Sequence, residues 1–444
     1  MIMSDWTSEP GESISPYSAV AGPGMEKTVE ADVLGLKFIN CHIKEAYQSL
    51  GLKLVLHDHD ESRVYNSGSS ISGEVVIRPS TSIRYMSIQI QLTGHARVSS
   101  GDGTVTSRVT HKFLELDMPL PPGQLDTPGT LQAGKTELIP FHFVIPYQLP
   151  SRSCLHEVDS DRLLFYHLRL PPSTGGWKKT DMSPDNVEIQ YHVRAVITKS
   201  HQKWPIDTPT METKRLVRVI PSSVEVADSS LDTVDDDIRR SLDDQSSRRG
   251  SSVSQRNEIA TTLSPISMHL GRDEQESQAT MQLGLFCHAQ GPPPAELIRK
   301  ITAKIRCYTW YNQKPQRDFP AVGDPGQVFT ISTPLEETTP PPQEWSRHRE
   351  LRSEDAASQG SQPMLNLYTS SIEIPLRLPT SKKTFLPTFH SCLVSRTYRL
   401  EVTVHFQSSA VKCGAPLRLL GPELAEPGLL PSYSHVSGQP SGST

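Results

Sequence analysis

The stretch IRYMSIQIQLTGHARV, residues 83–98, decides the fold class of this chain. Apolar and polar side chains alternate along its centre, in the order Ile88, Gln89, Ile90, Gln91, Leu92 and Thr93. A period of two places the apolar side chains on one face of an extended backbone, which is typical of a half-buried β-strand. We therefore expect a strand here, with its apolar face packed against a core.

Further strands are expected on both sides of this stretch. Just before it, the turn residues Asn66-Ser67-Gly68 are followed by a β-branched run that ends at Ile77. Other extended candidates lie at residues 52–56, 105–116, 136–145, 187–197, 216–220, 280–288, 298–310, 328–331, 371–378 and 398–406. Strong helical periodicity is absent, so the sequence predicts an all-β protein built from sandwiches.

The chain has 444 residues, which is room for two domains and substantial linkers. Residues 223–278 contain no Phe, Tyr or Trp and many charged and serine residues. They should therefore bury too little apolar surface to offset the conformational entropy that would be lost on ordering. Within the first segment, Val33–Ile43 is a candidate edge strand. The predicted organisation is an irregular segment 1–49, a first β-sandwich 50–222, a disordered linker 223–278, a second β-sandwich 279–420 with a long loop insertion 312–362, and a disordered tail 421–444.

Two distant regions repeat the same order of features. In the first, a strand ends at Pro146, Leu149-Pro150 opens a loop, and an alternating strand containing Tyr191 follows. In the second, Ile374-Pro375 and Leu378-Pro379 precede an alternating strand containing Tyr398. Because proline cannot donate to a sheet ladder, it suits the ends and edges of strands. The repetition predicts a duplicated β domain.

The composition argues against several classes of protein. The formal net charge is −5, which is unlike the basic footprint of a nucleic-acid-binding protein. The six cysteines are widely spaced without a CxxC pair, which favours buried apolar thiols over a disulfide framework. The N-terminal residues lack the basic and apolar regions of a signal peptide, and no stretch approaches the ~18 apolar residues of a membrane span. We therefore expect a cytoplasmic protein.

No pattern of catalytic residues is present. The sequence lacks HExxH, GxSxG, P-loop and GxGxxG motifs, and the histidines and cysteines show no spacing typical of a metal site, so we expect neither an enzyme nor a cofactor or metal. The run His57-Asp58-His59-Asp60 would place two imidazoles on one face of a strand. We interpret it as a polar turn leading to Arg63.

Four patterns, in this order along the chain, carry a family resemblance. They are Tyr65-x-x-Gly68-x-x-Ile71-x-Gly73-x-Val75, Ile88-x-Ile90-x-Leu92-x-Gly94, Phe141-x-Phe143-x-Ile145-Pro146-x-x-Leu149-Pro150 and Tyr191-x-Val193-x-Ala195. Through these patterns, residues 52–220 resemble the α-arrestin family. Residues 280–410 resemble it through Ile374-Pro375-x-x-Leu378-Pro379 and Tyr398-x-Leu400-x-Val402. The resemblance implies two tandem immunoglobulin-like β-sandwiches of the arrestin fold. It also implies an adaptor that links membrane transporters or receptors to ubiquitin ligases for endocytosis.

One motif in the tail fits the ligase-binding role. Leu430-Pro431-Ser432-Tyr433 has the form L-P-x-Y, a variant of the P-P-x-Y ligand of WW domains. Proline presets an extended backbone, and its ring and the tyrosine fill aromatic-lined grooves. Leu430, Pro431 and Tyr433 are therefore the candidate contacts for a HECT-type ligase. Family members often carry several P-P-x-Y copies, whereas this chain has none. The alternative is that the tail is solvated and binds no ligase.

The linker offers candidate phosphorylation sites. Ser241 and Ser251 follow the paired arginines Arg239-Arg240 and Arg248-Arg249, a pattern that suits kinases with acidic substrate clefts. A phosphate would add roughly −1.5 to −2 charges. The resemblance implies phosphorylation that controls activity, and the alternative is a mixed-charge linker that is never modified.

Two basic surfaces are candidates for contact with a cargo segment or anionic lipid. One is the loop Trp177-Lys178-Lys179, and the other is the strand candidate 298–310 with Arg299, Lys304 and Arg306. Each could instead be an ordinary solvated surface.

Three functions remain open from the sequence. The leading one is a trafficking adaptor that acts at the plasma membrane or endosomes and holds a ligase beside its cargo. The second is an arrestin-fold signalling scaffold for a membrane receptor, for example in ambient-pH sensing, without ligase recruitment. The third is a β-sandwich enzyme or carbohydrate-binding module, and the missing signal peptide and carboxylate motif count against it.

Overall fold

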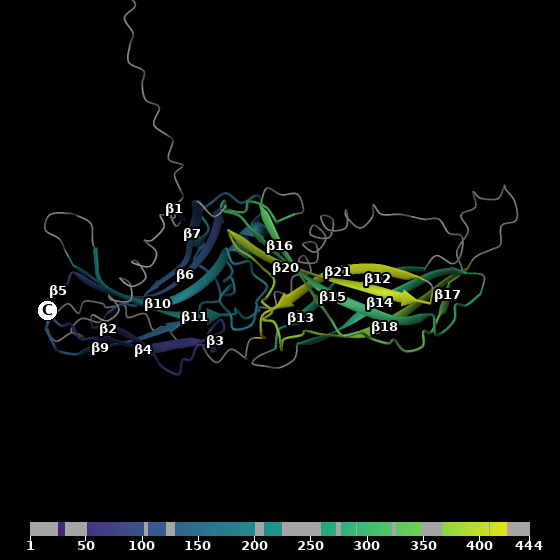
Figure 1. The fold of residues 1–444 in the computed structure, drawn as a ribbon, viewed down its shortest axis with the longest axis horizontal. Coiled ribbons are helices and arrows are strands. Elements are labelled where there is room, and N and C mark those ends of the chain that lie inside the picture. Colours follow the sequence, from purple (N-terminus) through teal and green to yellow (C-terminus); the bar gives the residue numbers. More distant parts are fainter. Residues whose placement is uncertain are drawn as a thin grey trace, which may run out of the picture.

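The computed structural model has the shape of two β-rich bodies placed end to end, with blue and teal strands in one and green and yellow strands in the other (Figure 1). The structure describes residues 25–31, 51–101, 105–120, 129–199, 208–223, 259–271, 277–289, 291–321, 326–348, 366–407 and 409–423. Within these ranges, no helix is long and apolar enough to cross a membrane.

The first sandwich packs a six-stranded sheet against a three-stranded sheet. The larger sheet has the order β1 (Met25–Ala31), β7 (Val105–Asp117), β6 (Ser87–Gly101), β10 (Val187–Lys199), β11 (Thr208–Val219) and β3 (Val64–Tyr65). The smaller sheet has the order β2 (Leu52–Leu56), β4 (Ser70–Ile77) and β9 (Glu137–Val144). A short ribbon joins β5 (Ile83–Arg84) to β8 (Thr130–Leu131), and η1 (Ser151–Ser153) and α2 (Asp161–His167) follow β9.

The alternation around Ile90 places β6 in the core as predicted. Ile88, Ile90 and Leu92 are buried in the first hydrophobic cluster. Gln91, on the other face, is also buried, and its amide donates to the Asp117 carboxylate at 2.7 Å. Gly94 is required by close packing, because a Cβ there would lie 2.4 Å from the ring of Phe113.

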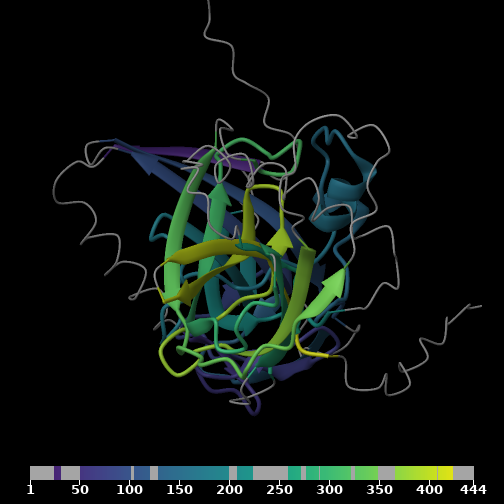
Figure 2. The ribbon, with the colours of Figure 1, turned by 90° about the vertical axis from the view of Figure 1, so that its right-hand side faces the viewer.

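The second sandwich has the same two-layer plan. One sheet has the order β13 (Ile266–His269), β21 (Ala410–Leu420), β20 (Val394–Phe406), β15 (Ile298–Tyr311) and β16 (Gln327–Pro334), and β19 (Phe389–His390) pairs with β20. The other has the order β12 (Ile259–Leu263), β14 (Gln278–Ala289), β18 (Asn366–Arg377) and β17 (Ser346–His348). Figure 2 looks onto this end of the molecule and shows the coil of α2 standing to one side.

The two sandwiches are copies of one plan. β10 lies between β6 and β11 in the first, as β20 lies between β15 and β21 in the second. In both copies a short strand runs parallel to the last long strand, β3 beside β11 and β13 beside β21. Tyr191 and Tyr398 are buried at matching positions and donate to the carbonyls of Pro171 and Leu386 at 2.6 and 2.8 Å. The fold class of two tandem immunoglobulin-like sandwiches is therefore confirmed, and the internal repetition in the sequence reflects a structural duplication.

Three of the expected irregular segments contain strands. The predicted linker 223–278 includes β12 and β13, the N-terminal segment 1–49 includes β1, and the predicted loop insertion 312–362 includes β17 in addition to β16, which confirms the strand candidate 328–331. These strands are mostly short and lie at or next to a sheet edge. Their own sequences therefore give only a weak indication of β-structure, and pairing with a longer neighbouring strand orders them. The candidate edge strand Val33–Ile43 lies outside the described residues.

A buried arginine joins the two sandwiches. Arg396 of β20 is 0% exposed, and its guanidinium donates to the Asp181 carbonyl and, at 2.6 Å, to the Ser183 hydroxyl, both in a loop of the first sandwich. It also donates to Thr309 of β15 at 3.0 Å. A charged group taken out of water is tolerated only when partners such as these satisfy it.

Apolar side chains interlock around this arginine. Met182, between the two partners of Arg396, belongs to the hydrophobic cluster of the second sandwich. In the other direction, Phe389, Leu393 and Val394 belong to the cluster of the first sandwich. Met182 holds a φ of 61°, which is a costly conformation for a bulky side chain and persists because its surroundings fix it.

Removing the buried tyrosine hydroxyls should destabilise each sandwich. Tyr191→Phe and Tyr398→Phe each leave a buried carbonyl without its donor, which costs about 1–3 kcal/mol of the free energy of unfolding. Urea denaturation followed by tryptophan fluorescence measures this loss. Tyr147→Phe is the control, because Tyr147 is exposed. Equal stability of all three variants would contradict the assigned role of the two hydroxyls.

Replacing Arg396 should uncouple the two sandwiches. Arg396→Ala leaves the hydroxyls and the carbonyl at the interface unpaired, and the loss should be about 3–5 kcal/mol, as for a broken buried charged contact. Calorimetry should then show two separate unfolding transitions where the wild type shows a coupled one. Arg299→Ala, which removes an exposed arginine of the same sandwich, should leave the profile unchanged. A single unshifted transition in Arg396→Ala would contradict the coupling.

Candidate functional site

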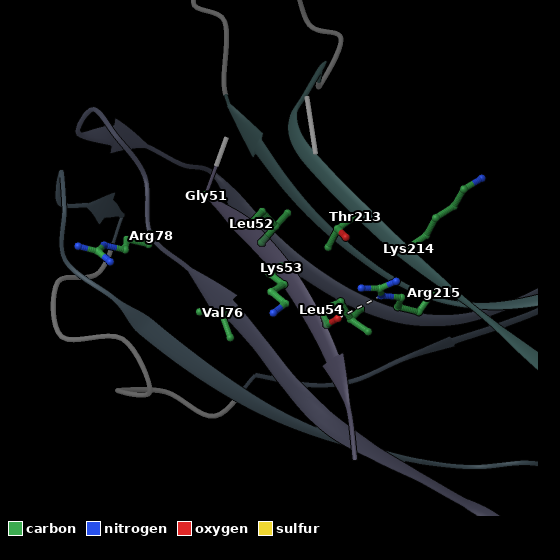
Figure 3. Close-up of a pocket in the computed structure, with 9 residues that line it drawn as sticks. All are labelled: Gly51, Leu52, Lys53, Leu54, Val76, Arg78, Thr213, Lys214 and Arg215. Atoms are coloured by element: carbon green, nitrogen blue, oxygen red, sulfur yellow. Dashed lines mark hydrogen bonds between the residues drawn. The ribbon is translucent and has the colours of Figure 1, made fainter. Parts of the chain in front are cut away.

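A groove runs along the first sandwich between β2 of the small sheet and β11 of the large sheet. Its first part, a hollow of about 360 Å³, is lined by side chains of both strands and by Arg78, which follows β4. Figure 3 shows Arg215 of β11 reaching toward Leu54 of β2, near Lys53 and with Arg78 further along, whereas the Lys214 side chain points away from the other lining residues. A second hollow of about 730 Å³ shares Lys53, Leu54 and Arg215 with the first, so the two are continuous.

The lining of the groove is strongly basic. The first hollow has Lys53, Arg78 and Arg215 and no carboxylate in its lining, and the second adds Arg63, Lys178 and Arg218 beside Asp60 and Glu61. We call this surface the basic groove and define it by Lys53, Arg63, Arg78, Lys178, Arg215 and Arg218. All of these except the half-buried Arg218 are exposed. Cations gathered in a concave surface attract an anionic ligand more strongly than scattered ones do.

The strand pattern explains how the groove acquires its charge. In β2, buried Leu52 and Leu54 alternate with exposed Lys53, so the strand holds the core while presenting a lysine outward. In β11, exposed Arg215 lies on the same face as buried Val217, whereas Lys214 lies on the opposite face, where its register partner is Arg194. The guanidinium of Arg215 donates to the Leu54 carbonyl at 3.4 Å and so spans the two strands.

β2 also lies at the edge of its sheet. Within the residues that the structure describes, it is the terminal strand of the sheet β2-β4-β9 and pairs with β4 alone, and its Leu54 carbonyl accepts from Arg215. An extended peptide can add to such an edge through backbone hydrogen bonds while its side chains reach the neighbouring surface. An acidic extended segment therefore matches this site in both shape and charge.

The charge of the groove is insensitive to pH near neutrality. Burial lowers the pKa of His59, which lines the second hollow and whose Nδ1 lies 3.1 Å from the Tyr65 hydroxyl. Hydrogen bonds from Ser62 lower the pKa of Asp60. His59 is therefore neutral and Asp60 ionised at neutral pH, and the positive charge comes from lysine and arginine. His57 and Asp58 lie in a turn after β2, in agreement with the interpretation of this run.

The Trp177 loop contributes to the groove only in part. Trp177 and Lys178 line the second hollow, and the guanidinium of Arg218 lies 4.9 Å from the centre of the Trp177 ring. Lys179 instead donates to the Thr380 carbonyl of the second sandwich at 3.1 Å. The loop is thus anchored between the two sandwiches and presents Lys178 to solvent.

The basic residues of β15 do not join this site. Lys304 and Arg306 share the carboxylate of Glu401, each at 3.0 Å, so one of their two positive charges is offset within the sheet. Arg299 lies beside Glu296 and a proline-rich loop at another hollow. The predicted contact surface on the second sandwich is therefore less basic than its sequence indicates, although its role in cargo or lipid contact stays a prediction.

Two predicted sites fall outside the described residues. These are the tail motif with Leu430, Pro431 and Tyr433, and the linker serines Ser241 and Ser251. Sequence reasoning missed most of the groove, including Lys53, Arg78 and Arg215. Only the tertiary structure places Arg215 of β11 beside Lys53 of β2.

Comparison with known proteins identifies both halves of the chain. The family model described as "Arrestin (or S-antigen), N-terminal domain" matches residues 54–223, which run from β2 to just after β11. The model described as "Bul1 C terminus" matches residues 330–419, which run from β16 to β21. A search of curated proteins gave no match. With a duplicated sandwich fold and these two matches in order along it, the chain belongs to the α-arrestin type of arrestin-related proteins.

Proposed function

We propose that this protein is a cytoplasmic trafficking adaptor that links plasma-membrane transporters or receptors to a WW-domain HECT ubiquitin ligase for ubiquitination and endocytosis. Its arrestin-type domains support the adaptor role in general, and such domains belong to non-catalytic families. The basic groove supports a more specific role for the first sandwich, namely capture of an acidic or phosphorylated cytoplasmic segment of the cargo.

The observation that carries this proposal is the coincidence of charge and free strand edge at β2. Six cations line the groove against two carboxylates, and within the described residues β2 pairs with one strand only, β4. A phosphorylated segment supplies several negative charges and accepts charge-assisted hydrogen bonds from arginine. Its backbone can extend the sheet of β2 at the same time.

Ligase recruitment is assigned to the tail. Leu430-Pro431-Ser432-Tyr433 would dock a WW domain, while the first sandwich holds the cargo. Tethering the two partners raises the effective concentration of the target lysines beside the ligase, so the chain itself need not catalyse any step. Recruitment to the plasma membrane or endosomes follows from cargo binding.

Charge reversal in the groove should weaken binding of an acidic segment. We expect a short fluorescent peptide rich in glutamate and phosphoserine to bind the purified full chain, with an affinity that falls as ionic strength rises. The double variant Lys53→Glu/Arg215→Glu should weaken this binding by at least about tenfold, or 1.4 kcal/mol. Fluorescence anisotropy at several salt concentrations measures both effects.

The matched control is Lys382→Glu/Lys412→Glu, which makes the same charge change at exposed sites of the second sandwich. It should bind the peptide as the wild type does. If the groove variant keeps its fold by circular dichroism and still binds at wild-type affinity, the groove is not the cargo site.

The tail motif should carry ligase binding. A panel of WW domains from HECT-type ligases, titrated against the full chain, should include at least one that binds, and Tyr433→Ala should abolish that binding because the tyrosine fills the groove beside the proline. Isothermal titration calorimetry measures the affinity. Ser432→Ala changes only the variable position of the motif and should bind as the wild type does. Absence of binding by the wild type, phosphorylated or not, would favour a signalling scaffold over a ligase adaptor.

A further inference from the structure

Four metal-binding side chains converge where the two sandwiches meet. Cys154, His156, His167 and Cys392 each direct one ligand atom to a common point, and these atoms lie within 4.8 Å of one another. Cys154 Sγ is 3.3 Å from His156 Nε2 and 3.6 Å from His167 Nδ1. The sequence showed no metal-type spacing because the fourth residue is remote in the chain and comes from the other sandwich.

Local structure fixes each member of the cluster. Cys154 follows the short helix η1, His156 lies in the loop after it, and His167 ends α2, whose first turn is capped by the Ser160 hydroxyl at 3.2 Å from the Leu163 nitrogen. Cys392 lies in the loop between β19 and β20. The ligand atoms therefore sit on loops and helix ends that are anchored to both sandwich cores.

The geometry and donor set fit a zinc ion. Tetrahedral coordination with Zn–S of about 2.3 Å and Zn–N of about 2.0–2.1 Å separates a sulfur from a nitrogen by roughly 3.6 Å. The two sulfur–nitrogen distances lie at or near this value. Two thiolates with two imidazoles in a tetrahedral array favour zinc over the harder divalent ions.

The surroundings of the cluster support the same assignment. Nδ1 of His156 lies 3.0 Å from the Glu157 carbonyl, which leaves Nε2 as the ligand atom. The Cys392 carbonyl accepts from the Gln316 backbone nitrogen at 2.8 Å, which fixes the loop that carries the thiol. His167 is almost fully buried, and Nε2 of its ring has no hydrogen-bond partner among the described residues. The polar contact of this imidazole with the cluster is therefore made through Nδ1.

We propose that Cys154, His156, His167 and Cys392 form a structural zinc site that joins the two sandwiches. Four protein ligands leave no open position for water or substrate, which is typical of a structural site. The first sandwich supplies three ligands and the second supplies one. The ion would therefore lock the domain arrangement near the ion pair between Arg317 and Asp159, which also crosses this boundary at 3.1 Å.

The test is metal analysis of the full chain, purified under reducing conditions from zinc-supplied cells and desalted. We expect one zinc per chain by mass spectrometry of the metal. Exchange into cobalt should give the visible bands of tetrahedral coordination and charge-transfer bands from two thiolates. Cys392→Ser should lose stoichiometric zinc and unfold at a lower temperature than the wild type. A zinc chelator should lower the unfolding temperature of the wild type and leave that of Cys392→Ser unchanged.

Two further variants keep the test decisive. Cys392→His retains a donor, so it should keep the metal while its cobalt form loses the contribution of one thiolate. Cys413→Ser removes a thiol outside the cluster and should keep wild-type zinc. The proposal is overturned if the wild type carries no stoichiometric zinc, if Cys392→Ser retains it, or if peptide mapping finds a disulfide between Cys154 and Cys392 in the purified chain.

Discussion

The arrangement of the whole molecule depends on the burial of one guanidinium group. Arg396 belongs to the core strand of the second sandwich, yet two of its partners come from the loop of the first sandwich that contains Asp181 and Ser183. Separation of the two sandwiches would break these hydrogen bonds and expose the apolar side chains that interlock around the arginine, which are Met182 on one side and Phe389, Leu393 and Val394 on the other. These contacts also fix Met182, whose side chain enters the second core and whose backbone takes a conformation rarely adopted outside glycine.

Duplication produced two sandwiches with one plan and different uses. β10 and β20 occupy the same central position, and Tyr191 and Tyr398 make the same kind of hydrogen bond to a loop carbonyl. The loop beside this position differs between the copies. In the first sandwich it reaches across to hold Arg396, and in the second it brings Phe389, Cys392 and Leu393 back against the first core. The domain boundary is therefore built from the two equivalent regions.

The distribution of carboxylates separates a binding surface from an ordinary charged one. Lys304 and Arg306 of β15 share the carboxylate of Glu401 on β20, which offsets one of their two positive charges. Along β2 and β11, the lining of the first hollow holds no carboxylate, and among the described residues no strand other than β4 pairs with β2. Attraction of an anionic segment and pairing with its backbone therefore coincide in the first sandwich, which is the half that matches the arrestin N-terminal model.

The sequence by itself determined the fold class, because period-two alternation such as Ile88, Ile90 and Leu92 reports local geometry within one strand. It also revealed the duplication through Tyr191 and Tyr398, since each repeat carries its own proline and aromatic positions. It did not find the short strands β12, β13 and β17, whose order comes from pairing with longer neighbours. Only the tertiary structure brought Lys53 near Arg215 and Cys392 beside Cys154. Sites of this kind depend on contacts between residues far apart in the chain, and no local pattern encodes such contacts.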